Sequence, residues 1–538
     1  MKRAAFFGIG MGLWLAAPSV SHAETYEIAA GDDIEAAIAM LQAGDELVLG
    51  GGMYVVTELF TVDLVGSEAQ PILIRAKDGE VPHVHRPDAN QNIVDINAQW
   101  VTFEGIEWSG GSAGIRISAS EHLTISNCEV HSTNDVAVRA NDGGVTYEAL
   151  HITGNEIHDT GNTGEGMYLG CNDNGCRLAN SVIERNWVHH TNGPTITQGD
   201  GIELKEGSYG NIIRDNVIHD TNYPCILTYS AVGNGEANII EGNAMWNCGD
   251  HAIQSAADSV IRNNIILSAN ASGISLQPHQ SGAPTNIVVV NNTIVVPGSR
   301  AINISGAVGP VTIANNAVYS EAGPAIMVGG DLGQVDIVSN VGLGGMSGGR
   351  GGYVDGDLVA DFVDAGFHGG TPNDVFPAAG ALQGTGNAEY APETDFNGLP
   401  INDPPDVGAY AYGPDGNPGW VLQAGFKEFP DIDGGDTDGD TAGGTDGDTS
   451  GGDEGSTGGG ESGGGVDDSN GSGGAGSDSG VDASGGEASS GPDADGSQED
   501  DGCGCRTDGG SAPLGAFALV MLGALTRRQR PALSLIHI

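Results

Sequence analysis

The segments NIIRDNVIHDT (211–221), NIIEGNAMWNC (238–248) and SVIRNNIILSA (259–269) are three copies of one pattern. Each copy has a short strand of alternating apolar residues, a polar pair that ends in Asn, and a second short apolar strand. A third short strand recurs between the copies, as in GIELK (201–205) and AIQSA (252–256). Further copies repeat the Asn position at spacings of 21 to 31 residues, which gives the series Cys128, Asn155, Asn186, Asn216, Asn243, Asn264, Asn292, Asn316 and Asn340.

Three short strands per repeat, with Gly and Asn at the corners, predict an all-β fold, a single-stranded right-handed parallel β-helix. In such a solenoid each coil buries its inward side chains against its neighbours. We expect the strand ladder to run from roughly residue 50 to 410. A leucine-rich repeat is excluded because the Leu-x-x-Leu-x-Leu frame is absent.

The repeated polar positions are interpreted as structural. Asn tolerates the left-handed conformation of a tight corner, and stacked amides can form hydrogen bonds along a ladder. A histidine column follows the same turn and is read in the same way, as stacked rings: His131, His158, His189 and His219.

The N-terminus has the features of a secretory signal peptide, residues 1–23. Lys2 and Arg3 precede an apolar run, and Ser21-His22-Ala23 has the small-x-small pattern of a cleavage site. The segment DDIEAAIAML (32–41) is amphipathic and is expected to form a short helix that caps the first coil. The segment 395–412 is expected to close the β-helix domain, predicted over residues 24–413.

The remainder of the chain predicts a tail in three parts. Residues 414–502 form an acidic Gly/Asp/Ser-rich linker, with 21 acidic residues and no Lys or Arg between Glu428 and Asp501, and its composition predicts disorder. The cysteine pair at 503–505, the apolar run 512–525 and the basic cluster 527–530 resemble C-terminal sorting signals of myxobacterial surface proteins. The resemblance implies that segment 503–530 is processed or anchored at the membrane. Residues 533–538 match a translated sequencing adaptor and are set aside as non-native.

The formal net charge of −52 argues against nucleic acid as a partner, because the folded part is acidic as well as the tail. Export would place the chain at the outer-membrane surface or in the medium, and we expect a monomer. An oxidising compartment permits disulfides, with Cys171 and Cys176 closing a small loop and Cys225 and Cys248 one repeat apart. A zinc site at the cysteines is disfavoured because no second Cys pair or His pair has ligand spacing.

Residues 24–413 resemble the right-handed β-helix family that includes pectate lyases. That fold hosts several chemistries, so function has to be argued from the site. Alternate residues of the third strand of each repeat point outward, and successive coils would align them in one polar groove. The segment GDGIELKEGSYGNIIR (199–214) resembles the E-x-x-x-x-K, then N-x-x-R, arrangement of β-helix lyases that act on uronic-acid polysaccharides by β-elimination.

Carried onto this chain, the resemblance implies that Lys205 is the base and that Asp200, Glu203 and Glu165 bind calcium or set the pKa of the lysine. Such enzymes place a second Arg about one coil later, where this chain has Cys225 to Tyr229. Arg139 or Tyr229 would have to replace it. The expected sugar contacts from the same groove are Tyr168, Gln254, Gln277, His279 and His251, with Trp246 as a further stacking surface.

Two other functions stay open. Asp200 and Asp250 could act as the carboxylate pair of a hydrolase, although the motifs of β-helix polygalacturonases are absent. The chain could also be a non-catalytic glycan-binding module or adhesin on a surface-anchored stalk. Glu203 and Lys205 would then be a charge pair on a solvated sheet.

Overall fold

The computed structural model describes residues 23–280, 282–298, 300–368, 372–378 and 380–429. The predicted signal peptide up to residue 22, the acidic linker from residue 430, the sorting segment 503–530 and residues 533–538 lie outside the described residues. No helix within these ranges is both long enough and apolar enough to cross a membrane.

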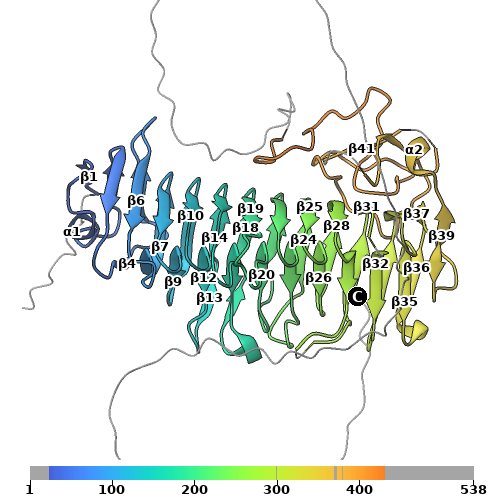
Figure 1. Cartoon of the computed structure of the whole chain (residues 1–538), viewed down its shortest axis with the longest axis horizontal. Helices are drawn as coiled ribbons and strands as arrows, with labels where there is room; N and C mark the ends of the chain where they lie inside the picture. The colour runs from blue at the N-terminus through green and yellow to red at the C-terminus, as the bar shows by residue number, and fades with distance from the viewer. Residues whose placement is uncertain (1–22, 281, 299, 369–371, 379, 430–538) are drawn as a thin grey trace, which may run out of the picture. The chain divides into compact units, whose positions relative to one another are not determined.

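The described chain winds into a right-handed parallel β-helix, as the repeat predicts (Figure 1). Each full coil contributes one strand to each of three parallel ladders, and β7 contributes to two of them as it turns a corner. The antiparallel pair of β40 (Phe362–Asp364) with β41 (Asp374–Pro377) lies outside these ladders.

The first ladder contains β1 (Thr25–Ile28), β2 (Glu46–Leu49), β5 (Ile72–Ala76), β7 (Val94–Glu104), β10 (Glu121–Ser126), β14 (His151–Thr153), β18 (Val182–Glu184), β21 (Ile212–Arg214), β24 (Asn238–Glu241), β27 (Ser259–Arg262), β30 (Ile287–Val290), β33 (Val311–Ala314) and β36 (Val335–Val338). The short strands β13 (Thr146–Glu148) and β17 (Arg177–Ala179) pair beside it.

The second ladder contains β3 (Gly52–Val55), β6 (Pro82–Arg86), β8 (Glu107–Gly110), β11 (Glu129–His131), β15 (Glu156–His158), β19 (Trp187–Thr191), β22 (Val217–Thr221), β25 (Ala244–Cys248), β28 (Ile265–Ala269), β31 (Thr293–Val296), β34 (Ala317–Ser320), β37 (Asn340–Leu343) and β39 (Tyr353–Asp355).

The third ladder contains β4 (Thr61–Val65), β7, β9 (Ile115–Ile117), β12 (Val138–Ala140), β16 (Met167–Leu169), β20 (Ile202–Leu204), β23 (Ile226–Thr228), β26 (Ile253–Ser255), β29 (Ser272–Leu276), β32 (Arg300–Ser305), β35 (Ile326–Gly329) and β38 (Met346–Ser347).

The strand ladder begins and ends earlier than the repeat predicts. It starts at β1 rather than near residue 50, because Thr25–Ile28 already pairs with β2, and it ends at β39 rather than near residue 410. The expected capping helix is present as α1 (Ile34–Ile38), whose Asp33 side chain accepts a hydrogen bond from the Ala36 amide. Ile34 and Ile38 are buried in the central core.

The Asn column is a continuous hydrogen-bonded ladder at the corner between the first and second ladders. Each side-chain Nδ2 donates to the next Oδ1 at 2.9 Å, from Asn155 through to Asn340. At its start the backbone amide of Cys128 donates to Asn155 Oδ1. The predicted column is confirmed, but the left-handed residue of each corner is the one before Asn, such as Asp215 (φ 56°) or Gly242 (φ 65°). The Asn is selected for its amide rather than for its backbone.

The histidine column stacks as predicted, along the outer face of the second ladder. Ring centroids are 5.1 Å apart for His131–His158, 4.9 Å for His158–His189 and 5.3 Å for His189–His219. The stack continues onto Trp246 at 4.7 Å.

After β39 the chain folds back along the outer face of the second ladder instead of adding coils (Figure 1). Leu358 of the short helix α2 (Leu358–Asp361), Phe376, Phe396 and Trp420 form a second apolar core against strands of that ladder. Lys427 anchors the C-terminal end of this segment to the β-helix. Its buried ammonium donates at 2.7 Å to Asp215 Oδ1 and to the Phe396 carbonyl.

Candidate functional site

Three carboxylates converge beside the third ladder. Glu165 precedes β16, Asp200 precedes β20, and Glu203 lies in the middle of β20 with its side chain opposite to the core residues Ile202 and Leu204. Carboxylate oxygens of the three residues all lie within 4.8 Å of one another. The residues are 1 %, 1 % and 2 % exposed.

Each of these carboxylates has one buried oxygen without a hydrogen-bond partner in the described part of the chain: Glu165 Oε2, Asp200 Oδ1 and Glu203 Oε2. An unpaired buried carboxylate is costly unless a proton or a cation compensates it. Three such carboxylates, close together and each with an unpartnered oxygen, would therefore be stabilised by positive charge.

Lys205 and Tyr229 lie on the other side of Glu203. Lys205 Nζ donates to Glu203 Oε1 at 2.7 Å, and the Tyr229 hydroxyl donates to the same oxygen at 2.9 Å. The two groups also contact each other, with Nζ 3.3 Å from the Tyr229 oxygen. Lys205 Nζ is 4.9 Å from the ring centroid of Tyr168 and 4.7 Å from that of Tyr229, so aromatic faces hold the ammonium on two sides.

Burial sets the protonation of the cluster. Burial, reinforced by the charge of Glu203, raises the pKa of Glu165 to about 7, and burial with the neighbouring carboxylates raises the pKa of Asp200 well above its ordinary value. Burial alone would lower the pKa of Lys205, but the charge of Glu203 outweighs it and the pKa is raised. Burial also raises the pKa of Tyr168 to about 12 and that of Tyr229 further.

The expectation of an open, solvated groove at these residues is wrong. Lys205 is 5 % exposed and Tyr229 is 3 % exposed, so the Glu203–Lys205 ion pair and the tyrosine beside it are buried. The turn after β16 contributes to the cover: Gly170 has φ 102°, and a Cβ there would meet Lys205 Cβ at 2.9 Å. The disulfide Cys171–Cys176 closes the loop that follows, and the Asp173 amide donates to Glu206, the residue after Lys205.

The other predicted catalytic residue, Arg139, belongs to a different set of contacts. It aligns with Tyr168 across β12 and β16. Its guanidinium reaches Asp135 at 3.6 Å and donates to Asn92 at 3.3 Å. Within the described residues no hydrogen bond or ion pair joins it to Lys205, so Tyr229 is the residue that occupies the position beside the lysine.

The predicted sugar contacts divide into two groups. The His279 ring stacks on Tyr229 at 4.9 Å, and Gln277 donates to Gln254 at 3.3 Å, so these three side chains extend the surface that begins at Tyr168. His251 lies apart. Its Nδ1 accepts from the Ser272 amide at 3.1 Å and its Nε2 is 3.8 Å from its neighbour Asp250.

Two further predicted features are located by the structure. Trp246 does not face the groove, because it belongs to the second ladder and is buried beneath the C-terminal segment. Cys225 and Cys248 form a disulfide that joins the start of β23 to the end of β25.

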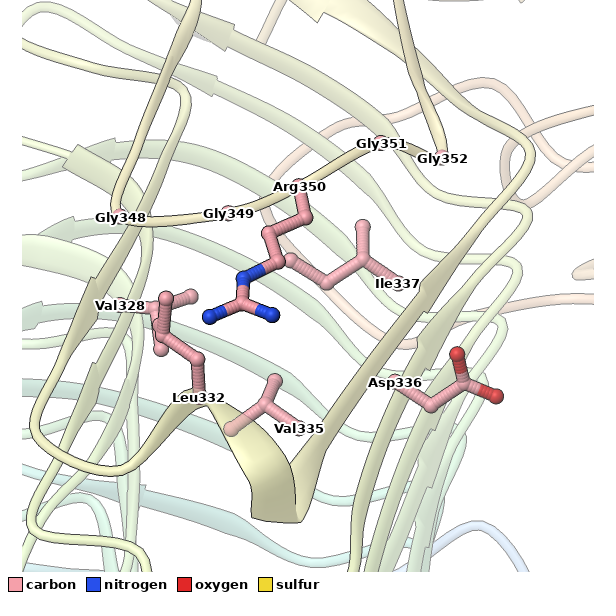
Figure 2. A pocket seen from close by; sticks show the side chains of 10 residues that line it. All are labelled: Val328, Leu332, Val335, Asp336, Ile337, Gly348, Gly349, Arg350, Gly351 and Gly352. Atoms are coloured by element: carbon pink, nitrogen blue, oxygen red, sulfur yellow. The ribbon is translucent and has the colours of Figure 1, made fainter.

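A cavity of about 270 Å³ lies at the C-terminal end of the solenoid, between the last coils and the loop Gly348–Gly352. Figure 2 shows the Arg350 guanidinium pointing toward Val328, Leu332 and Val335. None of the residues that line this cavity belongs to the carboxylate cluster.

The cluster fits a divalent cation with oxygen ligands. Calcium binds oxygens at about 2.3–2.6 Å, so ligands on opposite sides of one ion are separated by about 5 Å or less. One carboxylate oxygen from each of Glu165, Asp200 and Glu203 lies within 4.8 Å of the others, which agrees with this spacing, and each carboxylate has an oxygen without a hydrogen-bond partner. Sequence reasoning selected these three residues but missed their burial, since no local pattern encodes the covering loops.

Comparison with known proteins supports the β-helix fold. The family model described as right handed beta helix region matches residues 92–231 and 193–318. No curated protein matches the chain. Among solved structures, the chain is similar to XylC in complex with xylose at a TM-score of 0.50 and 12 % identity, covering 75 % of this chain and 99 % of that one.

Two solved lyases are also similar. An alginate lyase from Paenibacillus sp. has a TM-score of 0.41 and 18 % identity, covering 61 % of this chain and 99 % of that one. Pectate lyase Pel9A has a TM-score of 0.44 and 14 % identity, covering 73 % of this chain and 98 % of that one. The similarity to XylC shows the fold alone, and the activity has to be argued from the site.

Proposed function

We propose that this chain is a carbohydrate-active β-helix protein that cleaves an acidic, uronic-acid polysaccharide by β-elimination at Lys205 and Tyr229. The observation that carries the proposal is the juxtaposition of this hydrogen-bonded lysine–tyrosine pair with three buried carboxylates that lie within 4.8 Å of one another and each keep one oxygen without a hydrogen-bond partner. A structural ion pair needs one carboxylate, and two additional buried carboxylates only add to the desolvation cost.

Glu165, Asp200 and Glu203 would hold a calcium ion. When bound, the ion supplies positive charge opposite the carboxylate of the sugar and competes with Lys205 for Glu203. Without that competition the pKa of Lys205 stays raised, and an ammonium cannot accept a proton.

Lys205, as the free amine, takes the proton from the ring carbon next to the uronate carboxylate. The electron pair of that C–H bond forms the new carbon–carbon double bond, and the glycosidic carbon–oxygen bond breaks. The Tyr229 hydroxyl gives its proton to the departing oxygen. The 3.3 Å contact between Lys205 and Tyr229 lets the proton pass from the ammonium to the phenolate, which restores both groups.

The neighbouring side chains suit sugar binding in this scheme. Tyr168 and His279 present rings beside the Lys205–Tyr229 pair, and Gln254 and Gln277 offer amides to sugar hydroxyls. Arg139 is engaged with Asp135 and Asn92, so we assign it to positioning of this face rather than to proton transfer.

The experiment is an elimination assay on the purified chain with pectate, alginate and glycosaminoglycans, each with calcium and with a chelator. The unsaturated product is followed by its ultraviolet absorbance. Tyr229→Phe should lower kcat by about 100-fold or more, and Lys205→Ala should abolish turnover. Tyr223→Phe is the matched control, because Tyr223 is 43 % exposed and outside the cluster. Full activity in a folded Lys205→Ala variant would contradict the proposal.

A second function is glycan binding without cleavage: Lys205 and Glu203 are buried, unlike the solvated pair expected from the sequence, and a buried structural pair would have little access to the sugar ring. It predicts retention of an acidic polysaccharide in affinity electrophoresis with no unsaturated product under any condition of the assay. Product formation that is lost in Tyr229→Phe would exclude it.

We also propose that the chain is exported and held at the cell surface by segment 503–530. Deleting residues from 503 onward should release the protein into the medium without changing its melting temperature. Retention on the cells after this deletion would place the anchor elsewhere.

A further inference from the structure

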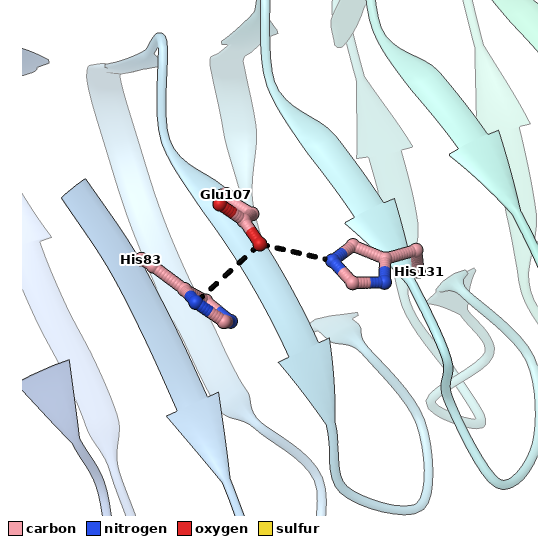
Figure 3. Close-up of side chains that lie close together, drawn as sticks. All are labelled: His83, Glu107 and His131. Carbon is pink, nitrogen blue, oxygen red and sulfur yellow. Dashed lines mark hydrogen bonds and ion pairs between the residues drawn. The ribbon is translucent and has the colours of Figure 1, made fainter. Parts of the chain in front are cut away.

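A second set of polar side chains lies on the outer face of the second ladder, on strands other than those of the carboxylate cluster. His83 of β6, Glu107 of β8 and His131 of β11 come from three successive coils. Glu107 Oε1 is 3.4 Å from His83 Nδ1 and 3.1 Å from His131 Nε2. Figure 3 shows the two imidazoles facing the same carboxylate oxygen from opposite sides.

This arrangement depends on a break in the histidine stack. Across β6, β8 and β11 the column reads His85, Ser109, His131, so a small side chain occupies the place of one ring. The space over Ser109 lets the rings of His83 and His131 approach to a centroid distance of 6.2 Å, although their strands are not adjacent.

The distances match a tetrahedral transition-metal site. Zinc binds imidazole nitrogen and carboxylate oxygen at about 2.0–2.1 Å, so neighbouring ligand atoms around one ion are about 3.3 Å apart. The separations from Glu107 Oε1, 3.4 and 3.1 Å, have this size. The neighbouring set Glu129, His131 and His158 is wider, with 3.9 Å between Glu129 Oε1 and His131 Nε2.

The outward nitrogens of the two histidines are already held. His83 Nε2 is 2.6 Å from Ser109 Oγ, which also lies 2.9 Å from His85 Nδ1, and His131 Nδ1 is 3.0 Å from Ser132 Oγ. Such contacts fix the ring orientation and direct the other nitrogen toward an ion. The three candidate ligands are about one-fifth exposed, with side-chain values of 21 %, 23 % and 19 %, so an ion can reach them from solvent.

We infer that His83, Glu107 and His131 form a binding site for one zinc ion or a similar borderline divalent metal, distinct from the oxygen-ligand cluster at Glu203. Two nitrogens and one carboxylate oxygen leave a fourth position for water or an external ligand. The ion links three successive coils through their strands β6, β8 and β11.

The test is a zinc titration of the full chain after metal removal, with a competing chromophoric chelator to report affinity. One tight equivalent is expected. His83→Gln and Glu107→Gln should each weaken it by about tenfold or more. His368→Gln is the matched control, since His368 pairs with Glu321 at 2.7 Å, away from the candidate ligands, and the variant should leave the tight equivalent intact. The acidic tail is present in every variant, so its weak binding cancels.

Two outcomes overturn the inference. One is an unchanged affinity in His83→Gln; the other is a loss in His158→Gln as large as that in His83→Gln, which would move the ion to Glu129. Cobalt substitution in the unaltered chain gives an independent measurement: the intense visible absorption of tetrahedral cobalt with nitrogen ligands is expected, and the weak spectrum of oxygen-only octahedral cobalt would contradict the site. Melting temperatures without metal check that each variant is folded.

Discussion

Two groups of buried polar side chains, the Asn ladder and the carboxylate cluster, lie in the same solenoid and differ in one respect. In the ladder every amide from Asn155 to Asn316 donates to the next one, and the side chains are fully buried with their bonds made. In the cluster Glu165, Asp200 and Glu203 are as deeply buried but each keeps an oxygen without a partner. Satisfied burial stabilises the fold, whereas unsatisfied burial costs stability and is retained where something binds.

The largest effect is expected from interrupting the ladder with Asn243→Ala. Asn243 Nδ2 donates to the Ile213 carbonyl and to Asn264 Oδ1, and its Oδ1 accepts from the amide and side chain of Asn216. Several buried groups lose partners together, so the free energy of unfolding should fall by about 4 kcal/mol. Denaturant unfolding measures it. Asn303→Ala, on the half-buried outer face with one bond to Ser275, is the control and should cost much less. Equal losses would mean that the ladder has no special role.

Replacing a carboxylate of the cluster should raise the free energy of unfolding, whereas replacing an amide of the ladder lowers it. The pKa of Glu165 is raised from 4.5 to about 7 in the folded chain, so the folded state holds a proton that the unfolded state releases first. Its contribution is favourable below pH 4.5 and is lost as the pH rises toward 7, by about 3 kcal/mol in total. Glu165→Gln should therefore stabilise the metal-free chain relative to the unaltered one more at pH 8 than at pH 4.5.

Calcium provides the control for this measurement. If the cluster holds the ion, added calcium should restore the stability of the unaltered chain at pH 8 and have little effect on Glu165→Gln. A pH-independent difference between the two proteins, with no response to calcium, would show that the carboxylates are compensated in some other way.

The smallest effect is expected at the border of the cluster. Tyr229→Phe removes the hydrogen bond to Glu203 Oε1 and the 3.3 Å contact with Lys205 Nζ, but those two groups keep their bond to each other, so the unfolding free energy should change by about 1 kcal/mol. Thermal unfolding is sufficient to measure it. A small change in stability together with a large loss of turnover would indicate that Tyr229 is catalytic. A large loss of stability would indicate a structural role, like that of the Asn ladder.

Sequence reasoning identified the residues of the site better than their environment. Strand alternation and the regular repeat place Glu203, Lys205 and Tyr229 in the outward third-strand column, and Glu165 and Asp200 lie in the turns that precede that strand. The same reasoning treated Trp246 as a groove residue, since spacing along the chain does not say which ladder lies under the returning C-terminal segment. It also read the histidines as structural without pairing His131 with His83.

The sequence by itself determined the β-helix coil, the Asn ladder at its corner and the outward column of the third strand. Each of these depends on contacts with the next repeat, so a local pattern repeated every 21 to 31 residues is sufficient to specify them. The tertiary structure decided what is covered. Lys427 reaches Asp215 across 212 residues of sequence, and the loop after β16 closes over Lys205 through a glycine and a disulfide. Burial of a charge depends on such distant segments, and burial is what turns an ordinary surface ion pair into a site with unpaired carboxylates and displaced pKa values.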